Sequence, residues 1–137
     1  MTVEQQVAGL VLRMADRLTQ RTDDLLEPHR LTSSQYEVLT ALQTAGNDGL
    51  ACGEIAGRLA TRDPDITRLL DRLEDRGFIN RVRGRPDRRV VRSRLTTEGR
   101  RVVVHLEAEL RVMHADLLGG MSARDLGALR SLLATAG

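Results

Sequence analysis

Apolar residues recur every three or four positions along most of the chain, the spacing that places side chains on one face of an α-helix. The first such stripe predicts a helix that ends near Pro28. Its members are Val7, Leu10, Val11, Met14 and Leu18. Residues 32–35, Thr-Ser-Ser-Gln, have the form of a capping box and predict the start of a second helix, which stops at 46–49. Its expected buried stripe is Val38, Leu39, Leu42 and Ala45.

Two shorter helices joined by a tight turn follow. The third predicted helix covers about residues 52–60, with Ile55 and Leu59 facing inward. In the turn, we expect Asp63 to cap the next helix and Pro64 to occupy its first position. The fourth helix ends at Gly77. Its apolar stripe is Ile66, Leu69, Leu70 and Leu73. This arrangement is typical of a helix–turn–helix.

The helical spacing of apolar residues ends after Gly77. Residues 78–83 and 89–95, the second with roughly alternating polar and apolar residues, predict two strands, with a hairpin tip at 84–88. A fifth helix starts at Thr96 or Thr97 and stops at residues 119–120. Its apolar positions step by three and four residues, as in a helix–helix seam. They are Val103, Leu106, Leu110, Met113 and Leu117. A last helix follows Ser122, with Leu126, Leu129, Leu132 and Leu133 as its apolar positions.

This order of elements predicts a mainly α protein with a small β-hairpin wing, in which a winged helix–turn–helix DNA-binding lobe lies within a helical dimerisation frame. The length of 137 residues corresponds to a single domain, 1–137. We expect the lobe at about 32–99 and the dimerisation helices at about 3–27 and 97–135. Tyr36 and Phe78 are the only aromatic residues, and such a composition favours a helical protein that completes its burial in a dimer.

Charge is distributed unevenly, although the formal net charge is only +2. Residues 58–101 contain 14 Arg and seven acidic residues, a local charge of +7. A basic middle between acidic flanks indicates a surface built for an anion. All 21 basic residues are Arg, whose guanidinium suits phosphate and guanine. Because single-strand and RNA binders stack bases on aromatic rings, the scarcity of aromatics favours double-stranded DNA as the partner.

The fourth helix has the polar face expected of a recognition helix, whose first turns present side chains to base edges in the major groove. The groove-facing candidates are Pro64, Asp65, Thr67, Arg68 and Arg72. The arginines could read guanine or grip phosphates. Asp65 could accept a hydrogen bond from cytosine or only stabilise the helix N-terminus.

The hairpin is the second basic group. Residues 81–101 contain nine Arg and two acids. We expect Arg85, Arg88 and Arg89 at its tip to enter a minor groove, where the negative potential attracts arginine. Asp87 lies between them, and we expect it to orient a neighbouring Arg through a charge-assisted hydrogen bond.

These segments resemble the MarR family of bacterial transcriptional regulators. Residues 65–81 are similar to its recognition helix and first wing strand. Residues 87–89, Asp-Arg-Arg, followed by 95–99, Leu-Thr-Thr-Glu-Gly, are similar to its wing signature and the start of its fifth helix. Residues 31–39 resemble its second helix, and the resemblance covers about 5–135. The sequence departs from the family at Ala51-Cys52, which stands where many relatives have Thr or Ser followed by Pro, and in its short wing tip.

The resemblance implies a homodimeric repressor that binds a pseudo-palindromic operator and is released by a small ligand, often a phenolic or other lipophilic anion. It assigns Arg89 to the minor groove, with Asp87 as the residue that positions it. The dimer interface would come from the first, fifth and sixth helices, with Leu106, Leu110, Met113, Leu117, Leu129 and Leu133. The ligand candidates, between the dimer helices and the lobe, are Met14, Leu18, His29, Tyr36 and Leu39.

Two residue types leave a sensing role open. Cys52 near a helix N-terminus could be a redox sensor, but a half-buried structural thiol is the preferred interpretation. His105 and Glu109 have the i, i+4 spacing of paired zinc ligands, and His29 and His114 are the other histidines. A surface pair is the preferred interpretation, so no metal or cofactor is expected.

Other classes of function have little support in the sequence. It has no Gly-rich phosphate loop, nucleophile elbow or evident catalytic carboxylate pair, so we do not expect an enzyme. A winged helix that contacts another protein without binding an operator is an alternative, which the nine-Arg hairpin disfavours. The N-terminus has no signal-peptide pattern and no apolar run reaches about 20 residues, so we expect a cytoplasmic protein.

Overall fold

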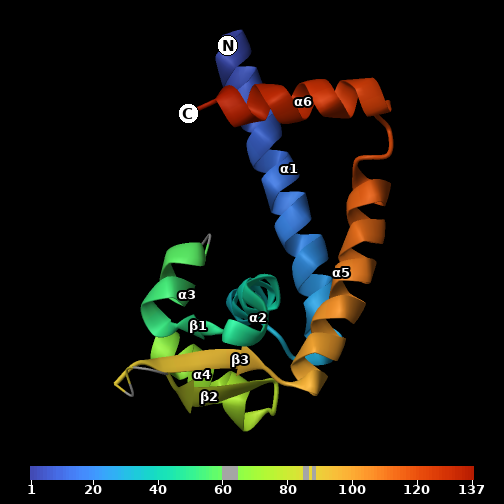
Figure 1. The fold of residues 1–137 in the computed structure, drawn as a ribbon. Coiled ribbons are helices and arrows are strands. Elements are labelled where there is room, and N and C mark those ends of the chain that lie inside the picture. The colour runs from blue at the N-terminus through green and yellow to red at the C-terminus, as the bar shows by residue number, and fades with distance from the viewer. Residues whose placement is uncertain (60–64, 85–86, 88) are drawn as a thin grey trace.

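A computed structural model of the chain describes residues 1–59, 65–84, 87 and 89–137 (Figure 1). A long helix and a short 3-10 turn lead into a lobe of helices and strands, and two helices return from it. The elements in chain order are α1 (Val3–Leu26), η1 (Glu27–His29), α2 (Ser33–Ala45), η2 (Gly46–Asp48), β1 (Leu50–Ala51), α3 (Cys52–Arg58), α4 (Ile66–Asp75), β2 (Ile79–Arg83), β3 (Val91–Leu95), α5 (Thr97–Leu117) and α6 (Ala123–Thr135). The six predicted helices and both predicted strands are thus confirmed.

Hydroxyl side chains begin most of the helices. Thr2, Thr32, Thr96 and Ser122 are N-caps whose oxygens accept from backbone N–H groups three residues on. The predicted capping box at Thr32 is confirmed, because Gln35 also accepts from the Thr32 N–H. At α3, Ala51 offers no side-chain cap, as expected, although Glu54 accepts from its N–H at 3.0 Å.

The predicted cap of α4 is wrong. The N-cap is Asp65, whose carboxylate accepts from the Arg68 N–H at 3.0 Å. Two aspartates flank Pro64, and the helix begins after the second of them, at Ile66. Asp63, the predicted cap, and Pro64, the predicted first residue of the helix, both lie outside the described residues.

Within the described residues, the sheet has three antiparallel strands in the order β1-β3-β2, one more than the hairpin predicted. The additional strand, β1, pairs Leu50 with Ser93 and Ala51 with Arg92. Gly49, which precedes it, has a φ of 69°, and a Cβ there would lie 2.3 Å from the Ser93 carbonyl oxygen. Glycine thus allows the close approach that joins β1 to the wing.

The core fills the space between α2, α4, the sheet and the N-terminal half of α5. Its fully buried side chains are Leu26, Val38, Leu39, Leu42, Ile55, Leu73, Ile79, Val103 and Leu106. The apolar stripes predicted for α2 and α4 are confirmed as buried, with Ala45 only partly covered.

The α5 seam has a different role from the one predicted. Leu106, Leu110 and Met113 are 0%, 8% and 5% exposed within a single chain, and α5 contacts both α1 and α2. The assignment of these three residues to a dimer interface is therefore corrected: the 3-4 stepping marks contacts inside the subunit. Leu117 is half-buried, whereas Leu129 and Leu133 are exposed.

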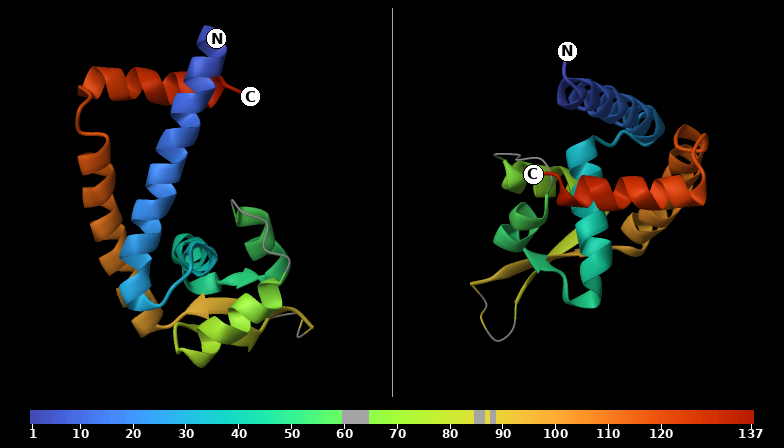
Figure 2. Two further views of the ribbon diagram at one scale, coloured as in Figure 1. Left: turned by 180° about the vertical axis from the view of Figure 1, so that it is seen from behind. Right: turned by 90° about the horizontal axis from the view of Figure 1, so that it is seen from above.

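The helical frame extends away from the lobe. In Figures 1 and 2, α1 and α5 run from the lobe towards α6, which lies at the far end of the molecule. No residue of α6 is buried, and apolar side chains of α1 and α6 face solvent. These exposed residues are Val3, Val7, Leu10, Val11, Leu12, Leu129, Leu132 and Leu133. No helix of the described residues is long and apolar enough to cross a membrane.

Candidate nucleic-acid interface

The amphipathic sequence of α4 separates a buried face from an exposed one. Ile66, Leu69, Leu70 and Leu73 hold the helix against the lobe. Thr67, Arg68 and Arg72 are exposed on the other side. Arg68 and Arg72 also line a surface hollow of about 240 Å³ together with Asp65 and Leu69. The first turns of α4 thus present two guanidinium groups one helical turn apart, next to a capped N-terminus.

Arg81 of β2 fixes the orientation of α4 relative to the wing. Its guanidinium donates to Asp71 at 2.6 Å and to Glu74 at 2.8 and 3.2 Å, and its backbone N–H donates to Glu74 at 3.0 Å. These bonds from Arg81 lower the pKa of the Glu74 carboxyl. The sequence shows Arg81 only as one of the nine arginines in residues 81–101. The structure shows that it links β2 to α4.

Arg76, the C-cap of α4, holds the same end of the helix against a different part of the molecule. Its guanidinium lies 4.8 Å from the centre of the Phe78 ring. It also donates to the backbone carbonyls of Arg30 and, at 2.6 Å, of His29. Both carbonyls belong to the turn between α1 and α2, so Arg76 joins the end of the candidate recognition helix to the helical frame.

The wing tip contains a second oriented guanidinium. The Asp87 carboxylate accepts from the Arg89 backbone N–H at 3.0 Å and from Arg89 Nε at 3.2 Å. These two bonds lower the pKa of Asp87. The Arg89 side chain is 92% exposed, so Asp87 orients it without covering it. The predicted pairing of Asp87 with a neighbouring arginine is confirmed.

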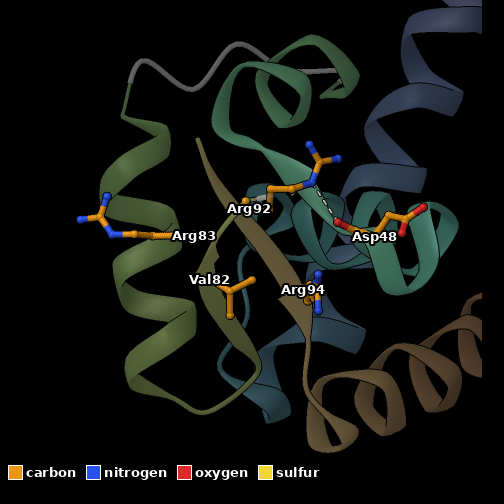
Figure 3. A pocket seen from close by; sticks show the side chains of 6 residues that line it. Asp48, Val82, Arg83, Arg92 and Arg94 are labelled. Atoms are coloured by element: carbon orange, nitrogen blue, oxygen red, sulfur yellow. Dashed lines mark hydrogen bonds between the residues drawn. The ribbon is translucent and has the colours of Figure 1, made fainter. Parts of the chain in front are cut away.

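The base of the wing is also basic. Arg83, Arg92 and Arg94 line a hollow of about 490 Å³ with Asp48, Val82 and Gly84 (Figure 3). Arg92 donates to the carbonyls of Asp48 at 2.9 Å and Gly49 at 3.1 Å. It also lies 3.5 Å from a Glu54 carboxylate oxygen. Arg92 therefore attaches the wing to η2 and α3, whereas Arg94 is exposed beside it.

The predicted DNA-contacting residues thus form two groups on the lobe. Thr67, Arg68 and Arg72 are exposed on α4, and Asp87 and Arg89 are paired on the wing. Asp65 is engaged as the N-cap. Arg85 and Arg88, like Pro64, lie outside the described residues. Sequence reasoning missed the linking roles of Arg76, Arg81 and Arg92, whose partners lie up to 47 positions away in the chain.

The ligand-binding candidates lie in different surroundings. Leu39 is fully buried in the core, which makes it a packing residue. Met14 lines a hollow of about 410 Å³ along α1 with Leu10 and Arg17. Tyr36 is half-buried, and burial raises the pKa of its phenol. Leu18 is half-buried on α1, and His29 contacts His105.

Cys52 differs from its prediction. It is exposed at the start of α3, not half-buried, because the seven-residue helix directs Ile55 into the core and leaves its first turn at the surface.

Known proteins are similar to this chain in architecture and in sequence. The sequence profile of the MarR family matches residues 31–91, from the start of α2 to the wing. The crystal structure of a MarR transcription factor from Planctomyces limnophilus is 35% identical, with a TM-score of 0.73, over 99% of this chain and 98% of that one. A mutant of E. coli MarR complexed with operator DNA has a TM-score of 0.79 at 23% identity, over 97% of this chain and 96% of that one.

A curated relative matches over most of the chain. It is the HTH-type transcriptional regulator TtmR of Methylorubrum extorquens, 34% identical over 132 residues. The match covers 96% of this chain and 64% of TtmR. The chain thus spans slightly less than two thirds of the length of this relative.

Proposed function

Because the chain belongs to the MarR family, we propose that it is a transcriptional regulator that binds a specific sequence of double-stranded DNA as a homodimer. The observation that supports this most directly is the joint presentation of two basic groups on the lobe. Arg68 and Arg72 are exposed on α4, and Arg89 is held outward by Asp87 on the wing.

Each group fits one groove of B-DNA. The major groove admits an α-helix, and arginine there makes bidentate contacts to guanine. The narrow minor groove has a more negative potential, which attracts an inserted arginine. Since Arg81 and Arg76 tie α4 to the wing and to the frame, the two groups would approach DNA as one rigid unit. Arg92 and Arg94 line the basic hollow at the wing base, and we propose that they contact backbone phosphates.

The partner that we propose for the exposed apolar residues of α1 and α6 is a second copy of this chain. Val7 and Leu10 are 51% and 59% exposed, and Leu132 and Leu133 are 67% and 50% exposed. A symmetric dimer that covers them would present two copies of α4, one from each subunit. A dimeric helix–turn–helix protein reads half-sites about 34 Å apart, one turn of DNA, so the operator would be pseudo-palindromic.

Repression relieved by a small lipophilic or phenolic anion is the regulation that we propose for this dimer, acting in the cytoplasm and without a catalytic step. A ligand that binds a dimer with a different α4 spacing would lower DNA affinity by its differential affinity for the two states. Of the candidates, Met14, Leu18, His29 and Tyr36 retain exposed surface for such a ligand.

Fluorescence anisotropy tests the DNA proposal. The labelled duplex covers the region upstream of the protein's own gene, and a scrambled duplex of the same composition is the comparison. We expect tighter binding to the native duplex, with a slope of log K against log salt of about −0.9 per neutralised phosphate. Arg68→Ala should weaken binding by about tenfold or more, whereas Arg111→Ala, at an exposed position of α5, should not. Absence of binding at low salt, or equal losses in both variants, would refute the proposal.

Light scattering tests the dimer. Leu133→Asp, at the exposed face of α6, should give a folded monomer that no longer binds the duplex with high affinity. Val91→Asp is the matched control, because Val91 on β3 is 42% exposed and lies outside the frame; it should remain dimeric. A monomeric wild type, or a Leu133→Asp dimer, contradicts the assignment of this face.

A further inference from the structure

Three possible metal ligands from two distant segments meet beside α5. His105 Nε2 lies 2.9 Å from Glu109 Oε1. The ring of His29 lies 5.4 Å from that of His105, centre to centre, at a tilt of 59°. One ligand atom from each of the three residues falls within 4.8 Å of the other two. Residues 76 positions apart in the chain, His29 and His105, thus form one cluster of two imidazoles and a carboxylate.

The cluster is held by the backbone on both sides. His105 and Glu109 are one turn apart on α5, which places their side chains on the same face. His29 ends η1, between Pro28 and Arg30. Arg30 has a φ of 54°, a left-handed conformation that is uncommon for a residue other than glycine. Arg76 donates to the carbonyls of both His29 and Arg30, so this turn is fixed in the position that brings His29 to α5.

A surface ion pair explains only part of this arrangement. The His105–Glu109 contact needs no third residue, yet the fixed turn adds a second imidazole beside it. All three side chains of the cluster are partly exposed to solvent. Those of His105 and Glu109 are 56% and 38% exposed, and His29 is half-buried. An ion could therefore reach the cluster from solvent.

We propose that His29, His105 and Glu109 bind a divalent first-row transition metal ion, with zinc as the representative ion. Zinc binds imidazole nitrogen and carboxylate oxygen at about 2.0–2.2 Å, so two tetrahedral ligands lie about 3.3–3.6 Å apart. Rotamer adjustments of about 1 Å would bring the three atoms to that spacing. The fourth position is open to water. Two nitrogen ligands favour such an ion over Mg²⁺ or Ca²⁺, which prefer oxygen.

The proposal does not depend on DNA binding, so its test uses the full chain alone, free of any affinity tag. Co²⁺ is the spectroscopic probe, Zn²⁺ is the competitor, and excess Mg²⁺ is the ion control. We expect one Co²⁺ per chain, displaced by Zn²⁺ and not by Mg²⁺. Because loss of an outer-shell partner already reduces metal affinity by about 10–100-fold, His105→Ala and Glu109→Gln should each weaken Co²⁺ binding by at least about tenfold.

His114→Ala is the matched control. His114 is exposed on the same helix and is not part of the cluster, so this variant should bind Co²⁺ like the wild type. Circular dichroism checks that each variant is folded, and His29→Gln provides a test on the turn side that leaves α5 unchanged. The proposal is overturned if the His105 and His114 variants lose affinity equally, if His29→Gln has no effect, or if the wild type binds only adventitiously, without fixed stoichiometry.

Discussion

Replacing Arg81 with glutamine should destabilise the protein more than the same change at Arg94, an exposed arginine of the same sheet. Arg81 forms two ion pairs, with Asp71 at 2.6 Å and with Glu74 at 2.8 Å, and its side chain is only 25% exposed. Exposed ion pairs each contribute about 0.2–1 kcal/mol. The two carboxylates share one guanidinium of low exposure, so we place both pairs near the upper end, at about 1–2 kcal/mol in total.

Urea denaturation measures this loss. At a slope of about 2 kcal/mol per molar urea, within the usual range, a loss of about 1–2 kcal/mol should lower the midpoint of Arg81→Gln by about 0.5–1 M. Arg94→Gln is the control, since it removes the same charge from an exposed position of β3 and should stay within about 0.5 kcal/mol of wild type. All samples need the same protein concentration, because the stability of a dimer depends on it.

A double-mutant cycle isolates the pair. Glu74→Gln combined with Arg81→Gln should cost less than the sum of the single changes, because each single change removes the same contact. Additive effects, or a midpoint of Arg81→Gln equal to that of Arg94→Gln, would refute the view that Arg81 links α4 to the wing.

Other contacts in the molecule lead to three more predictions. Since Glu74 has a lowered pKa, its contribution to stability is complete above the unfolded value of about 4.3 and disappears as pH falls through the lower folded value. The part of the wild-type advantage over Arg81→Gln that comes from Glu74 should therefore shrink in denaturation curves as the pH falls below about 4.3. Asp87→Ala should weaken duplex binding in anisotropy by about 2–10-fold through loss of the Arg89 hydrogen bonds, whereas charge alone predicts tighter binding. Leu106→Ala should cost about 2–5 kcal/mol in urea denaturation, because the side chain is fully buried, while Val104→Ala, 53% exposed on the same helix, should cost under about 0.5 kcal/mol.

The parts of the fold that sequence predicts are those in which the signal is local. Thr32 and Gln35 satisfy each other's backbone groups within one turn, so their spacing alone identifies the start of α2. The buried stripe of α4 repeats with the helical period and is visible for the same reason. By contrast, β1 has two residues, too few to show an alternating pattern.

Periodicity identifies a buried face but not the surface that covers it. The stepping of Leu106, Leu110 and Met113 fits a contact with a partner subunit as well as one with α1 and α2, and the fold makes it the second. The arginines show a similar limit. Arg81 and Arg89 belong to the same basic segment, but only the packing of α4 beside β2 decides that Arg81 is engaged with two acids. Asp71 and Glu74, three residues apart on α4, were the available signal.

The turn η1 connects two features of the molecule that the sequence keeps apart. The carbonyl of His29 accepts a hydrogen bond from Arg76 at the end of α4, and the imidazole of the same residue lies in the proposed metal cluster. A metal that holds His29 against α5 would therefore restrict the turn to which α4 is attached, and by reciprocity DNA binding would change metal affinity by the same factor. The link also limits the size of this effect. Hydrogen bonds from a charged group are worth about 1.5–3 kcal/mol each, and Arg76 makes two to this turn, so coupling transmitted through Arg76 cannot exceed about 3–6 kcal/mol.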